Sequence, residues 1–502
     1  KVYTYEGYDF VTVWDFPRTG MNQGYPTLRM MGEGGAAFNL FVLVPGGFGT
    51  VEVDPMLEED QETYAVGTSV TLTAKPKDGA KFLRWEGDVV VANELVTTVA
   101  MTRNQTVRAI FYKEITSVND LVTTVAPSMN GFFVLTQDLD LSTIENFSPI
   151  GSASKPFTGY FEGNGHTISG LTIDAAAAND QGLFAALGKN ATVKSIKFDN
   201  PTIVGKNNVG VLAGTSTGAE VVDCSVTAGS VTGEEFVGSL IGKNDAKANI
   251  DNFASTGVDI SGLTNIGGTV GANLGKSVIY ASAIEAAKLS ASGFDSFIGG
   301  SVGLNDGSYI FGLSTLNGEI DGFNTNGGAV AHNTNGGEVL QIASDMAVSG
   351  YDYTGGLIGL NEGNVLETTV TGNVLGHSYV GGLIGSNATG TSVAICRSFG
   401  QVDGQNYVGG LIGDNFGGVQ YAFAIGEVTG DDTVGGLIGS NAGDLSDVYA
   451  MGSPWGDSYV GGLVGYQDAG TIERAYAAGR LSEGGVYSGG LIGANNGGKV
   501  ID

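Results

Sequence analysis

The stretch YVGGLIGSN at residues 379–387 returns as YVGGLIGDN at 407–415 and as YVGGLVGYQ at 459–467. Related phrases recur along the chain at intervals of 26 to 32 residues. The first glycine of each phrase, or its nearest equivalent, stands at residues 182, 210, 238, 267, 299, 327, 355, 381, 409, 435, 461 and 489. A period of this length is typical of a solenoid, a propeller or an array of helices.

The composition of each repeat selects among these architectures. The repeats contain short runs rich in β-forming residues, such as SVAICRSFGQV at 392–402 and VQYAFAIGEV at 419–428, separated by Gly, Asn and Asp. Helical arrays need longer runs with a period of 3.6, and a propeller blade needs about 40–45 residues. About 28 residues suit one coil with three short strands and three turns. The sequence therefore predicts an all-β chain built on a three-sided parallel β-helix, or β-solenoid, of about twelve coils, right-handed as parallel connections usually are.

An amide side chain follows the repeated phrase in most coils. The predicted ladder contains Asn244, Asn273, Asn305, Asn333, Asn361, Asn387, Asn415, Asn441 and Asn495, with Gln467 as the amide variant. Stacked coils would place these amides above one another, where each can hydrogen-bond to its own turn or to the next amide. We predict that this ladder is structural.

Two further columns consist of aromatic residues. The first contains Phe253, Tyr280, Phe311, Phe399, Phe423, Tyr449 and Tyr476, and we interpret it as core stacking in preference to a ligand-binding strip. The second precedes the repeated phrase and contains Tyr353, Tyr379, Tyr407, Tyr459 and Tyr487. Its strand is apolar on both alternating faces, so one face is either packed in the core or open as a binding strip. Core packing is the favoured alternative.

The two cysteines test the solenoid hypothesis. Cys224 and Cys396 occupy matching positions in coils that are six repeats apart. At ~4.8 Å per coil they would lie nearly 30 Å apart, whereas a disulfide needs Cα atoms within about 7 Å. We therefore expect two unpaired, buried thiols.

Composition and charge exclude several classes of partner. The chain has 84 glycines in 502 residues, 42% hydrophobic residues and a formal charge of −29, most of it beyond residue 113. Such a surface repels nucleic acid and anionic membranes, and no apolar run reaches the roughly 18 residues of a membrane span. The acidity suits the solubility of a large secreted protein, with acceptance of divalent cations as the alternative. No cofactor is expected, and calcium is an open alternative without a located site.

These repeats resemble the GLUG repeat of bacterial surface proteins, adhesin-like proteins and the non-catalytic part of some immunoglobulin A metallopeptidases. The resemblance covers roughly residues 114–502 and includes FSPIGSASKPFTGYFEGNGHTISGLTI at 147–173, which resembles the opening of such arrays. Departures such as GGTVG at 267–271 make the regularity of the coils near 267, 299 and 327 doubtful. The resemblance implies a β-solenoid at a cell surface.

The remaining segments define four predicted regions. Residues 32–113 resemble a divergent internalin-type B repeat, a small β module, through GTSVTLTAKPKDGAKFLRWEGD at 67–88, where Phe82 and Trp85 are expected in the core. Residues 114–180 form the solenoid opening, with a short capping helix in TSVNDLVTTV, and residues 181–502 form the coils. Residues 1–31 resemble the segment that closes a GLUG solenoid, although here they precede it.

The position of this closing segment suggests two forms of assembly. Either the chain is one period of a giant tandem protein, or residues 1–31 complete the open end of another copy by strand complementation. A contact of the second kind is heterologous and builds an open fibre. The expected partners are thus copies of the chain or adjoining repeats of a larger one.

Catalytic motifs are weak in this sequence. His166, His332 and His377 are the only histidines, and none has the His-Glu-x-x-His spacing of a metallopeptidase. GTSTG at 214–218 matches a nucleophile-elbow pattern around Ser216, but glycine is too abundant for the match to be informative. Asp431 and Asp432 are adjacent, so they do not form the facing pair of acids that a glycosidase needs. We predict no catalytic or metal-binding residue and no enzymatic activity.

The favoured function is that of an extracellular bacterial structural and adhesive protein, a stalk or fibre segment at the cell surface. A cell-surface carbohydrate-binding protein that uses the tyrosines between 353 and 487 is the alternative. A polysaccharide-degrading β-helix enzyme is a weaker alternative, because no pair of acids defines a site.

Overall fold

The computed structural model describes residues 14–15, 27–28, 37–58, 61–313, 315–481 and 486–501. The chain divides into two compact units, Lys1–Glu114 with Asn130–Val134 and Ile115–Met129 with Leu135–Asp502. Of the predicted closing segment, only β1 (Trp14–Asp15) and β2 (Thr27–Leu28) are described, and they pair antiparallel. The other residues of 1–31, which we expect to close a solenoid, lie outside the described part of the chain.

The first unit is a small β module. Three antiparallel strands form one sheet, and a second group joins β10 to β8 antiparallel and to β4 parallel. The strands are β3 (Ala37–Phe38), β4 (Leu40–Leu43), β5 (Gly49–Asp54), β6 (Tyr64–Ala65), β7 (Ser69–Pro76), β8 (Ala80–Glu86), β9 (Val96–Ala100) and β10 (Gln105–Ile115). Trp85 and Phe111 are buried in the core, and the half-buried ring of Phe82 lies between them, with ring centroids 5.5 and 5.7 Å away.

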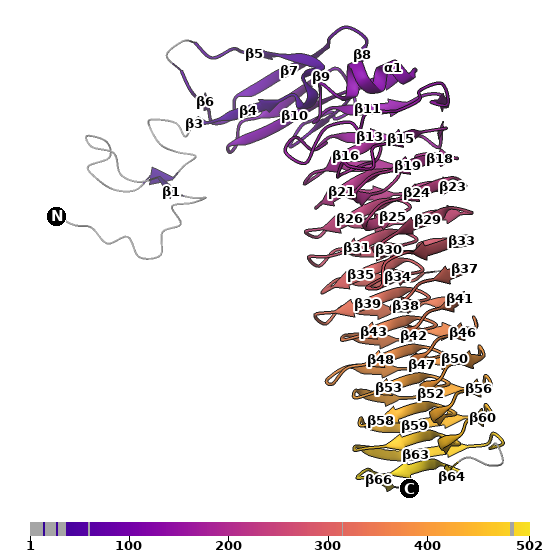
Figure 1. The fold of residues 1–502 in the computed structure, drawn as a ribbon. Helices are drawn as coiled ribbons and strands as arrows, with labels where there is room; N and C mark the ends of the chain where they lie inside the picture. The colour runs from indigo at the N-terminus through magenta and orange to yellow at the C-terminus, as the bar shows by residue number, and fades with distance from the viewer. Residues whose placement is uncertain are drawn as a thin grey trace. The chain divides into compact units, whose positions relative to one another are not determined.

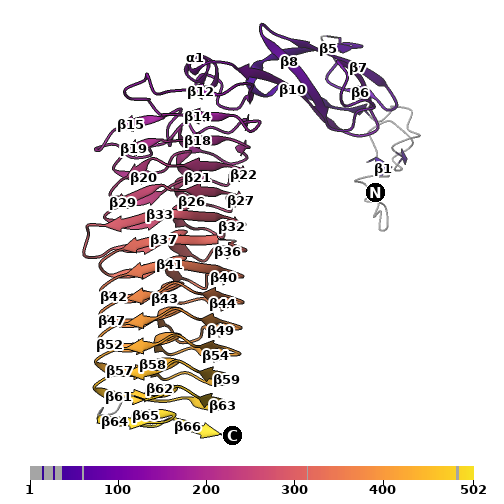
Figure 2. The ribbon, with the colours of Figure 1, turned by 90° about the vertical axis from the view of Figure 1, so that its right-hand side faces the viewer.

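A short helical segment opens the second unit, as the sequence predicts. Helix α1 (Val118–Asp120) begins after Ser117, whose side chain accepts a hydrogen bond from the Asp120 backbone, while the Asp120 carboxylate accepts one from the Ser117 backbone. This reciprocal pair satisfies amide groups that a helix start leaves free. A wider helical turn continues through Leu121–Val125 and buries Leu121 and Val125. The helix lies at the end of the solenoid that carries β12 (Leu139–Asp140) and β13 (Tyr160–Glu162) (Figures 1 and 2).

The rest of the second unit is a parallel β-solenoid, which confirms the predicted fold class. Successive coils stack along one axis, as Figure 1 shows. One sheet contains eleven strands from β20 (Asn207–Val209) to β64 (Val486–Gly489), and another contains twelve from β16 (Phe184–Leu187) to β65 (Ile492–Asn495). A third side joins the remaining strands of each coil. Each strand pairs with its equivalents in neighbouring coils, so the period of the sequence becomes the register of the sheets.

The third side differs from the prediction of one strand per side. A central coil consists of β47 (Ser378–Gly381), β48 (Ile384–Asn387), β49 (Ser392–Ala394), β50 (Arg397–Ser398) and β51 (Val402–Asp403). The first two strands belong to the two regular sheets, and the last three share the third side. Bends at Ile395, which has a φ of 57°, and around Gly400 divide that side into short segments.

The coils near residues 267, 299 and 327, in which the repeated phrase varies, stay in register with their neighbours. Gly238, Gly267, Gly299, Gly327 and Gly355 pair successively through the eleven-stranded sheet. The longer repeats place their additional residues on the third side, in β33 (Ala283–Ala291), β37 (Thr315–Asp321) and β41 (Ala343–Ser349). The variant phrases therefore preserve the stacking of the coils.

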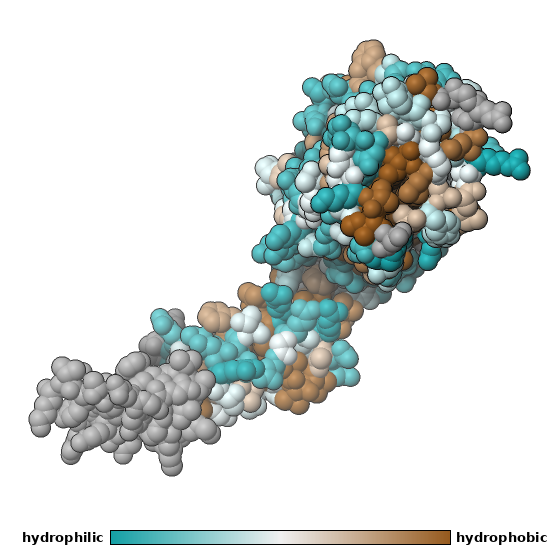
Figure 3. Space-filling view, turned by 90° about the horizontal axis from the view of Figure 1, so that it is seen from below, coloured by the Kyte–Doolittle hydropathy of each residue, from teal (hydrophilic) through white to brown (hydrophobic). Residues whose placement is uncertain are grey.

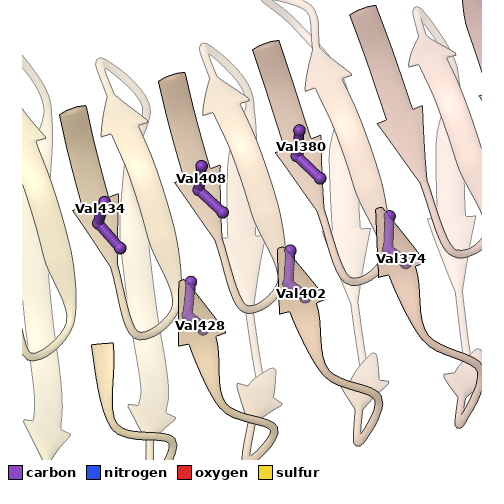
Figure 4. Close-up of a cluster of buried hydrophobic side chains, with 6 residues drawn as sticks. All are labelled: Val374, Val380, Val402, Val408, Val428 and Val434. Atoms are coloured by element: carbon purple, nitrogen blue, oxygen red, sulfur yellow. The ribbon is translucent and has the colours of Figure 1, made fainter. Parts of the chain in front are cut away.

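The interior of the solenoid is built from apolar columns. Val380, Val408 and Val434 are stacked on the eleven-stranded sheet, and Val374, Val402 and Val428 face them from the third side (Figure 4). All six side chains are at most 2% exposed. Seen from the last coil, apolar residues form a patch within a mostly hydrophilic rim (Figure 3). Because successive coils add equivalent apolar side chains to each column, the interior coils are buried alike, whereas the last coil, with Val500 and Ile501 each 52% exposed, is not.

Close backbone contact explains the paired glycines of the repeated phrase. A Cβ atom on Gly409 would overlap the carbonyl oxygen of Ile412, where the chain folds sharply between two sheets. A Cβ atom on Gly410 would overlap the carbonyl oxygen of Gly436 in the next coil. Only glycine leaves room for both the fold-back and the stacking of coils.

Candidate functional site

The amide column forms a continuous hydrogen-bonded ladder. From Asn244 to Gln467, each asparagine donates its side-chain N–H to the side-chain oxygen of the next amide, at N···O distances of 2.7–3.0 Å. These side chains are at most 1% exposed. Asn495 is exposed in the last coil, where it pairs in register with Gln467 and donates to the Gly498 carbonyl.

The same amides also bond to their own turns. Asn361, Asn415 and Asn441 each donate to a backbone carbonyl two residues later, at 2.9 Å. A buried amide that uses both its oxygen and its NH₂ group within the protein has little capacity left for a ligand. The ladder therefore links the coils and is not a binding surface.

The ladder has a defined first member. Ser216 precedes Asn244 in the strand register, and both side chains are buried. Among the described residues, neither the Ser216 hydroxyl nor the Asn244 side-chain oxygen has a hydrogen-bond partner. The serine side chain thus leaves the first acceptor of the ladder without a donor.

The first aromatic column does not belong to the core, contrary to our interpretation. Phe253 alone is buried, and the other six rings are half-buried or exposed. The strand register also separates two groups, since Tyr280 pairs with Asp251 whereas Phe423 pairs with Arg397. The rings alternate with buried neighbours such as Ile279 and Ala424, so strand alternation turns the rings outward. Within the groups, Tyr280 stacks on Phe311, and Phe423, Tyr449 and Tyr476 stack in sequence, at 4.7–5.2 Å between ring centroids.

The tyrosine column also lies on the outer surface, so the favoured expectation of core packing is wrong. Stacked pairs join Tyr353 to Tyr379, Tyr379 to Tyr407, and Tyr459 to Tyr487, with ring centroids 4.9–5.1 Å apart and planes within 8°. Exposure rises to 61% at Tyr487. The valines that follow these tyrosines, such as Val380 and Val408, are buried and supply the core.

A single position interrupts this column. Thr433 in β57 (Asp432–Gly435) occupies the place of the tyrosine between Tyr407 and Tyr459, because Asp432 pairs with both Asn406 and Ser458. The tyrosines and Thr433 share a left-handed backbone, with φ of 44–59°. This conformation is unfavourable for a β-branched residue, so Thr433 is a locally strained residue.

A surface groove of about 460 Å³ lies at the interruption. Its lining includes four tyrosines, three aspartates and two hydroxyl residues: Tyr379, Tyr407, Tyr459, Tyr466, Asp414, Asp432, Asp468, Thr433 and Ser440, with Phe416 and Ala442. The Tyr466 ring stands at 84° to the Tyr459 ring, with their centroids 5.7 Å apart. A concave site with aromatic walls and a few convergent polar groups is the usual form of a small-molecule site.

The polar groups of the groove come from neighbouring strands. Asp414 in β53 (Ile412–Asn415) is half-buried and shares a hydrogen bond with the Ser440 side chain of β58 (Ile438–Asn441). Burial raises the pKa of the Asp414 carboxyl, and the Ser440 contact opposes this increase. The Thr433 hydroxyl lies 3.3 Å from the Asp432 carboxylate, to which it donates. The groove therefore offers hydrogen-bond acceptors and hydroxyl groups beside the aromatic rings.

Other residues from the sequence analysis do not form a second site. Cys224 and Cys396 are buried free thiols, six coil steps apart in the register, as predicted. His332 and His377 lie near Glu362 and Asp352, at 3.6 and 4.0 Å. Within the part of the chain that the structure describes, no three His, Cys, Asp or Glu side chains gather closely enough to hold a metal ion.

The sequence reasoning missed Thr433, Asp414, Ser440 and Tyr466. Thr433 could have been found as the one interruption of the Tyr-Val-Gly-Gly pattern between the coils of Tyr407 and Tyr459. Asp414, Ser440 and Tyr466 all precede the ladder amide, and strand alternation turns that position away from the buried amide. Their convergence with the tyrosines depends on the angle between the two sheets, which no local pattern indicates.

Two family models match parts of the chain. Residues 42–115 match the divergent InlB B-repeat domain, and residues 456–482 match the GLUG motif. Both matches confirm the resemblances identified in the sequence. In the described residues, no helix combines the length and the apolar character needed to cross a membrane.

Known proteins show similarity over part of the chain. Halomucin of Haloquadratum walsbyi is 33% identical over 189 residues, which are 36% of this chain and 2% of halomucin. An immunoglobulin A1 protease of Streptococcus pneumoniae is 27% identical over 188 residues, 33% of this chain and 10% of the protease. A solved structure of an IgA1 protease aligns with 93% of this chain and 28% of its own, at 14% identity and a TM-score of 0.25. The chain thus spans only a small part of the curated relatives that it matches. The chain itself contains a β-solenoid, a GLUG motif and a divergent InlB B-repeat domain.

Proposed function

We propose that this chain is a segment of an extracellular bacterial stalk or fibre that presents an adhesive surface. The unbroken ladder of buried amides from Asn244 to Gln467 carries this proposal. Between the coils of Asn244 and Gln467, these side-chain hydrogen bonds add to the backbone pairing of successive strands, as a load-carrying rod requires. Twelve stacked strands at ~4.8 Å give the solenoid a length on the order of 55 Å.

The outer surface supports an adhesive role for the stalk. Stacked rings of tyrosine and phenylalanine remain partly exposed along two sides, where a soluble protein would ordinarily carry polar residues. Exposed aromatic rings supply large contact area at little cost in conformational entropy. The relatives named halomucin and immunoglobulin A1 protease are compatible with this proposal.

Adhesion can be tested with beads that carry the full chain. We expect such beads to resist detachment under flow on at least one of three surfaces, namely a mucin, a matrix glycoprotein or a layer of the chain itself. Beads that carry albumin are the control. Retention equal to the albumin beads on all three surfaces would contradict the adhesive role.

Self-association along the axis is part of the same proposal. The strands β64, β65 and β66 (Lys499–Ile501) are the last in their sheets, and strand complementation by residues 1–31 of another copy would extend those sheets. Electron microscopy at high protein concentration should show filaments that repeat at the length of one chain. Isolated short rods at every concentration would contradict end-to-end assembly.

The proposal assigns no reaction and no cofactor to the chain. The alternative of a polysaccharide-degrading enzyme can be tested separately by incubating the protein with a panel of glycans, with and without calcium. We expect no release of reducing ends above a heat-denatured control. Release that depends on native protein would support the enzymatic alternative instead.

A further inference from the structure

The gap in the tyrosine column has the dimensions of one additional ring. Tyr407 and Tyr459 are separated by two coil steps, so their rings lie ~9.6 Å apart along the axis. Within the column, adjacent rings stack with centroids 4.9–5.1 Å apart. A ring inserted above Thr433 would therefore have a tyrosine on each side at the spacing that the column itself uses.

The gap holds a flat ring, as the stacking of the column's own tyrosines shows, and its width also admits a thicker saturated ring. Two optimal carbon–carbon contacts of about 3.5–4.0 Å, one on each face of a flat ring, span only about 7–8 Å. The remaining ~2 Å of the ~9.6 Å separation accommodates the pucker and the axial hydrogens of a six-membered sugar ring. The C–H groups on both faces of such a ring would meet the electron-rich faces of the tyrosines.

Polar groups at the gap match the hydroxyls of a sugar. The Asp414 carboxylate has about four acceptor positions, and the Ser440 hydroxyl uses one of them. Asp432 and Thr433 also line the groove, and Thr433, which is 5% exposed, donates its hydroxyl to the Asp432 carboxylate. A carboxylate can accept hydrogen bonds from two adjacent hydroxyls of one ring, and bonds to a charged acceptor are the stronger ones.

The charge of the groove narrows the class of sugar. Asp414, Asp432 and Asp468 line it, and the lining includes neither lysine nor arginine. The whole chain carries a formal charge of −29. A sugar acid or a phosphorylated glycan would be repelled, whereas an uncharged ring would not.

From these observations we infer that the gap at Thr433 is a binding slot for one neutral six-membered sugar ring of a glycan, held between Tyr407 and Tyr459. The inference rests on the proposed adhesive function and names its ligand class. The Asp414 carboxylate orients the ring through its hydroxyls. The remaining stacked tyrosines, among them Tyr379, extend a platform for further sugar residues of the same glycan.

Direct binding measurements with the full chain test the slot. Saturation-transfer NMR and tyrosine fluorescence titrations would use three neutral probes, maltotriose, cellotriose and mannotriose. Sialyllactose serves as the anionic probe and N-acetyltyrosinamide as the flat aromatic probe. We expect at least one neutral trisaccharide to saturate with a Kd on the order of 1 mM, as suits a contact centred on one ring.

Three variants locate the binding. Thr433→Tyr fills the slot with the ring that neighbouring coils carry, so it should weaken trisaccharide binding at least tenfold while the protein stays folded. Asp414→Ala should weaken binding and leave the stacked rings in place. Tyr353→Thr is the matched control, because Tyr353 belongs to the same column but does not line the groove. Circular dichroism melting would verify the fold of each variant.

Several outcomes would overturn the slot. These are no saturable binding by any neutral trisaccharide, unchanged binding by Thr433→Tyr, or tighter Thr433-dependent binding of sialyllactose or N-acetyltyrosinamide than of the neutral probes. The last result with the aromatic probe would indicate an aromatic side chain of a protein partner. Failure of the slot is distinguishable from failure of adhesion, because beads that adhere equally with Thr433→Tyr retain the adhesive function without the slot. Trisaccharide binding that depends on Thr433, together with no bead retention, would retain the slot and contradict the adhesive function.

Discussion

At the scale of single residues, buried polar side chains determine how firmly neighbouring coils are joined. Asn387 accepts hydrogen bonds from Asn361 and Thr391 and donates one to Asn415, each at 2.8 Å. Such groups are costly to bury and stabilise the fold only when all of them are paired. Each amide therefore has a larger effect when it is removed than its own net contribution suggests.

Replacing Asn387 with alanine should destabilise the solenoid strongly. The change leaves a side-chain donor of Asn361 without its acceptor and removes a donor from the Asn415 side-chain oxygen, at about 1–3 kcal/mol for each buried group, whereas Thr391 keeps its bond to the Ala388 carbonyl. We expect a loss of about 2–5 kcal/mol in the free energy of unfolding, measured by denaturant titration. Asn495→Ala is the control, since that amide is exposed and should cost far less. Equal losses for the two variants would contradict the role of burial.

Replacing Ser216 with asparagine should stabilise the protein. An amide at this position can donate to the Asn244 side-chain oxygen, which lacks a partner, and would extend the ladder by one member. We expect a gain of about 1 kcal/mol, the typical net value of a hydrogen bond, seen as a higher Tm. Ser216→Ala removes the hydroxyl without adding a donor and should give no comparable gain. A lower Tm for Ser216→Asn would show that the first coil has no room for the amide.

The buried thiol of Cys224 should make stability fall at alkaline pH. Burial raises its pKa from 9.0 to about 12, so between these values the unfolded chain loses the thiol proton while the folded chain keeps it. The free energy of unfolding is therefore unaffected by this thiol below about pH 9 and falls as the pH rises above it, by about 2–3 kcal/mol at pH 11. The comparison is the slope of unfolding free energy against pH for the wild type and for Cys224→Ala. Parallel slopes above pH 9 would contradict the prediction.

At the scale of strands, the outer columns show how a repeated sequence builds a continuous surface. The tyrosines of adjacent strands stack because the register places each ring above the last, and Thr433 interrupts the surface without interrupting the sheet. Backbone pairing determines the continuity of the strand stack, whereas side-chain identity determines the continuity of its outer face. A surface site can therefore arise in one coil without loss of the scaffold.

Completion of the tyrosine column should raise stability. Thr433→Tyr adds two stacking contacts, each worth about 0.5–1.5 kcal/mol, and removes a β-branched residue from a left-handed position. We expect the unfolding free energy to rise by about 1–2 kcal/mol in denaturant titrations. Thr433→Val keeps the β-branch and adds no ring, so it should give no increase. A decrease for the tyrosine variant would mean that Asp414 and Ser440 leave no space for the ring.

At the scale of the whole solenoid, stability is a sum of coils and of contacts between neighbouring coils. Each coil pairs with the coil before it and the coil after it, and the anchors keep a constant register along the eleven-stranded sheet. Removal of one complete period should thus bring two equivalent surfaces together. Removal of part of a period should place strands of different sides against one another.

Deletion of residues 381–408 should leave a shorter but folded solenoid. The deletion joins Val380 to Gly409 and so restores the Tyr-Val-Gly-Gly phrase. We expect the Tm to fall by only a few degrees, and the rod in electron micrographs to shorten by ~4.8 Å. The matched control removes residues 381–394, half a period, and should abolish cooperative unfolding measured by circular dichroism. Similar behaviour of the two deletions would contradict a nearest-neighbour architecture.

The amino-acid sequence by itself determined the period, the parallel stacking, the amide ladder and the isolation of the two thiols. These features repeat along the chain, and because each coil pairs with its equivalent, a period in the sequence becomes a column in space. The small module and the capped helical turn were also recognisable, since local patterns of alternation and capping specify them.

Only the tertiary structure decided which columns face outward and where they leave a gap. The tyrosines adopt left-handed backbone angles within their strands, and such residues disturb the simple alternation from which we inferred core packing. The groove also needs two sheets to meet at an angle that brings Asp414 and Ser440 beside Thr433. The paired glycines of each repeat fold the chain from one sheet to the other, but the groove takes its lining from several coils, so no single repeat contains the site.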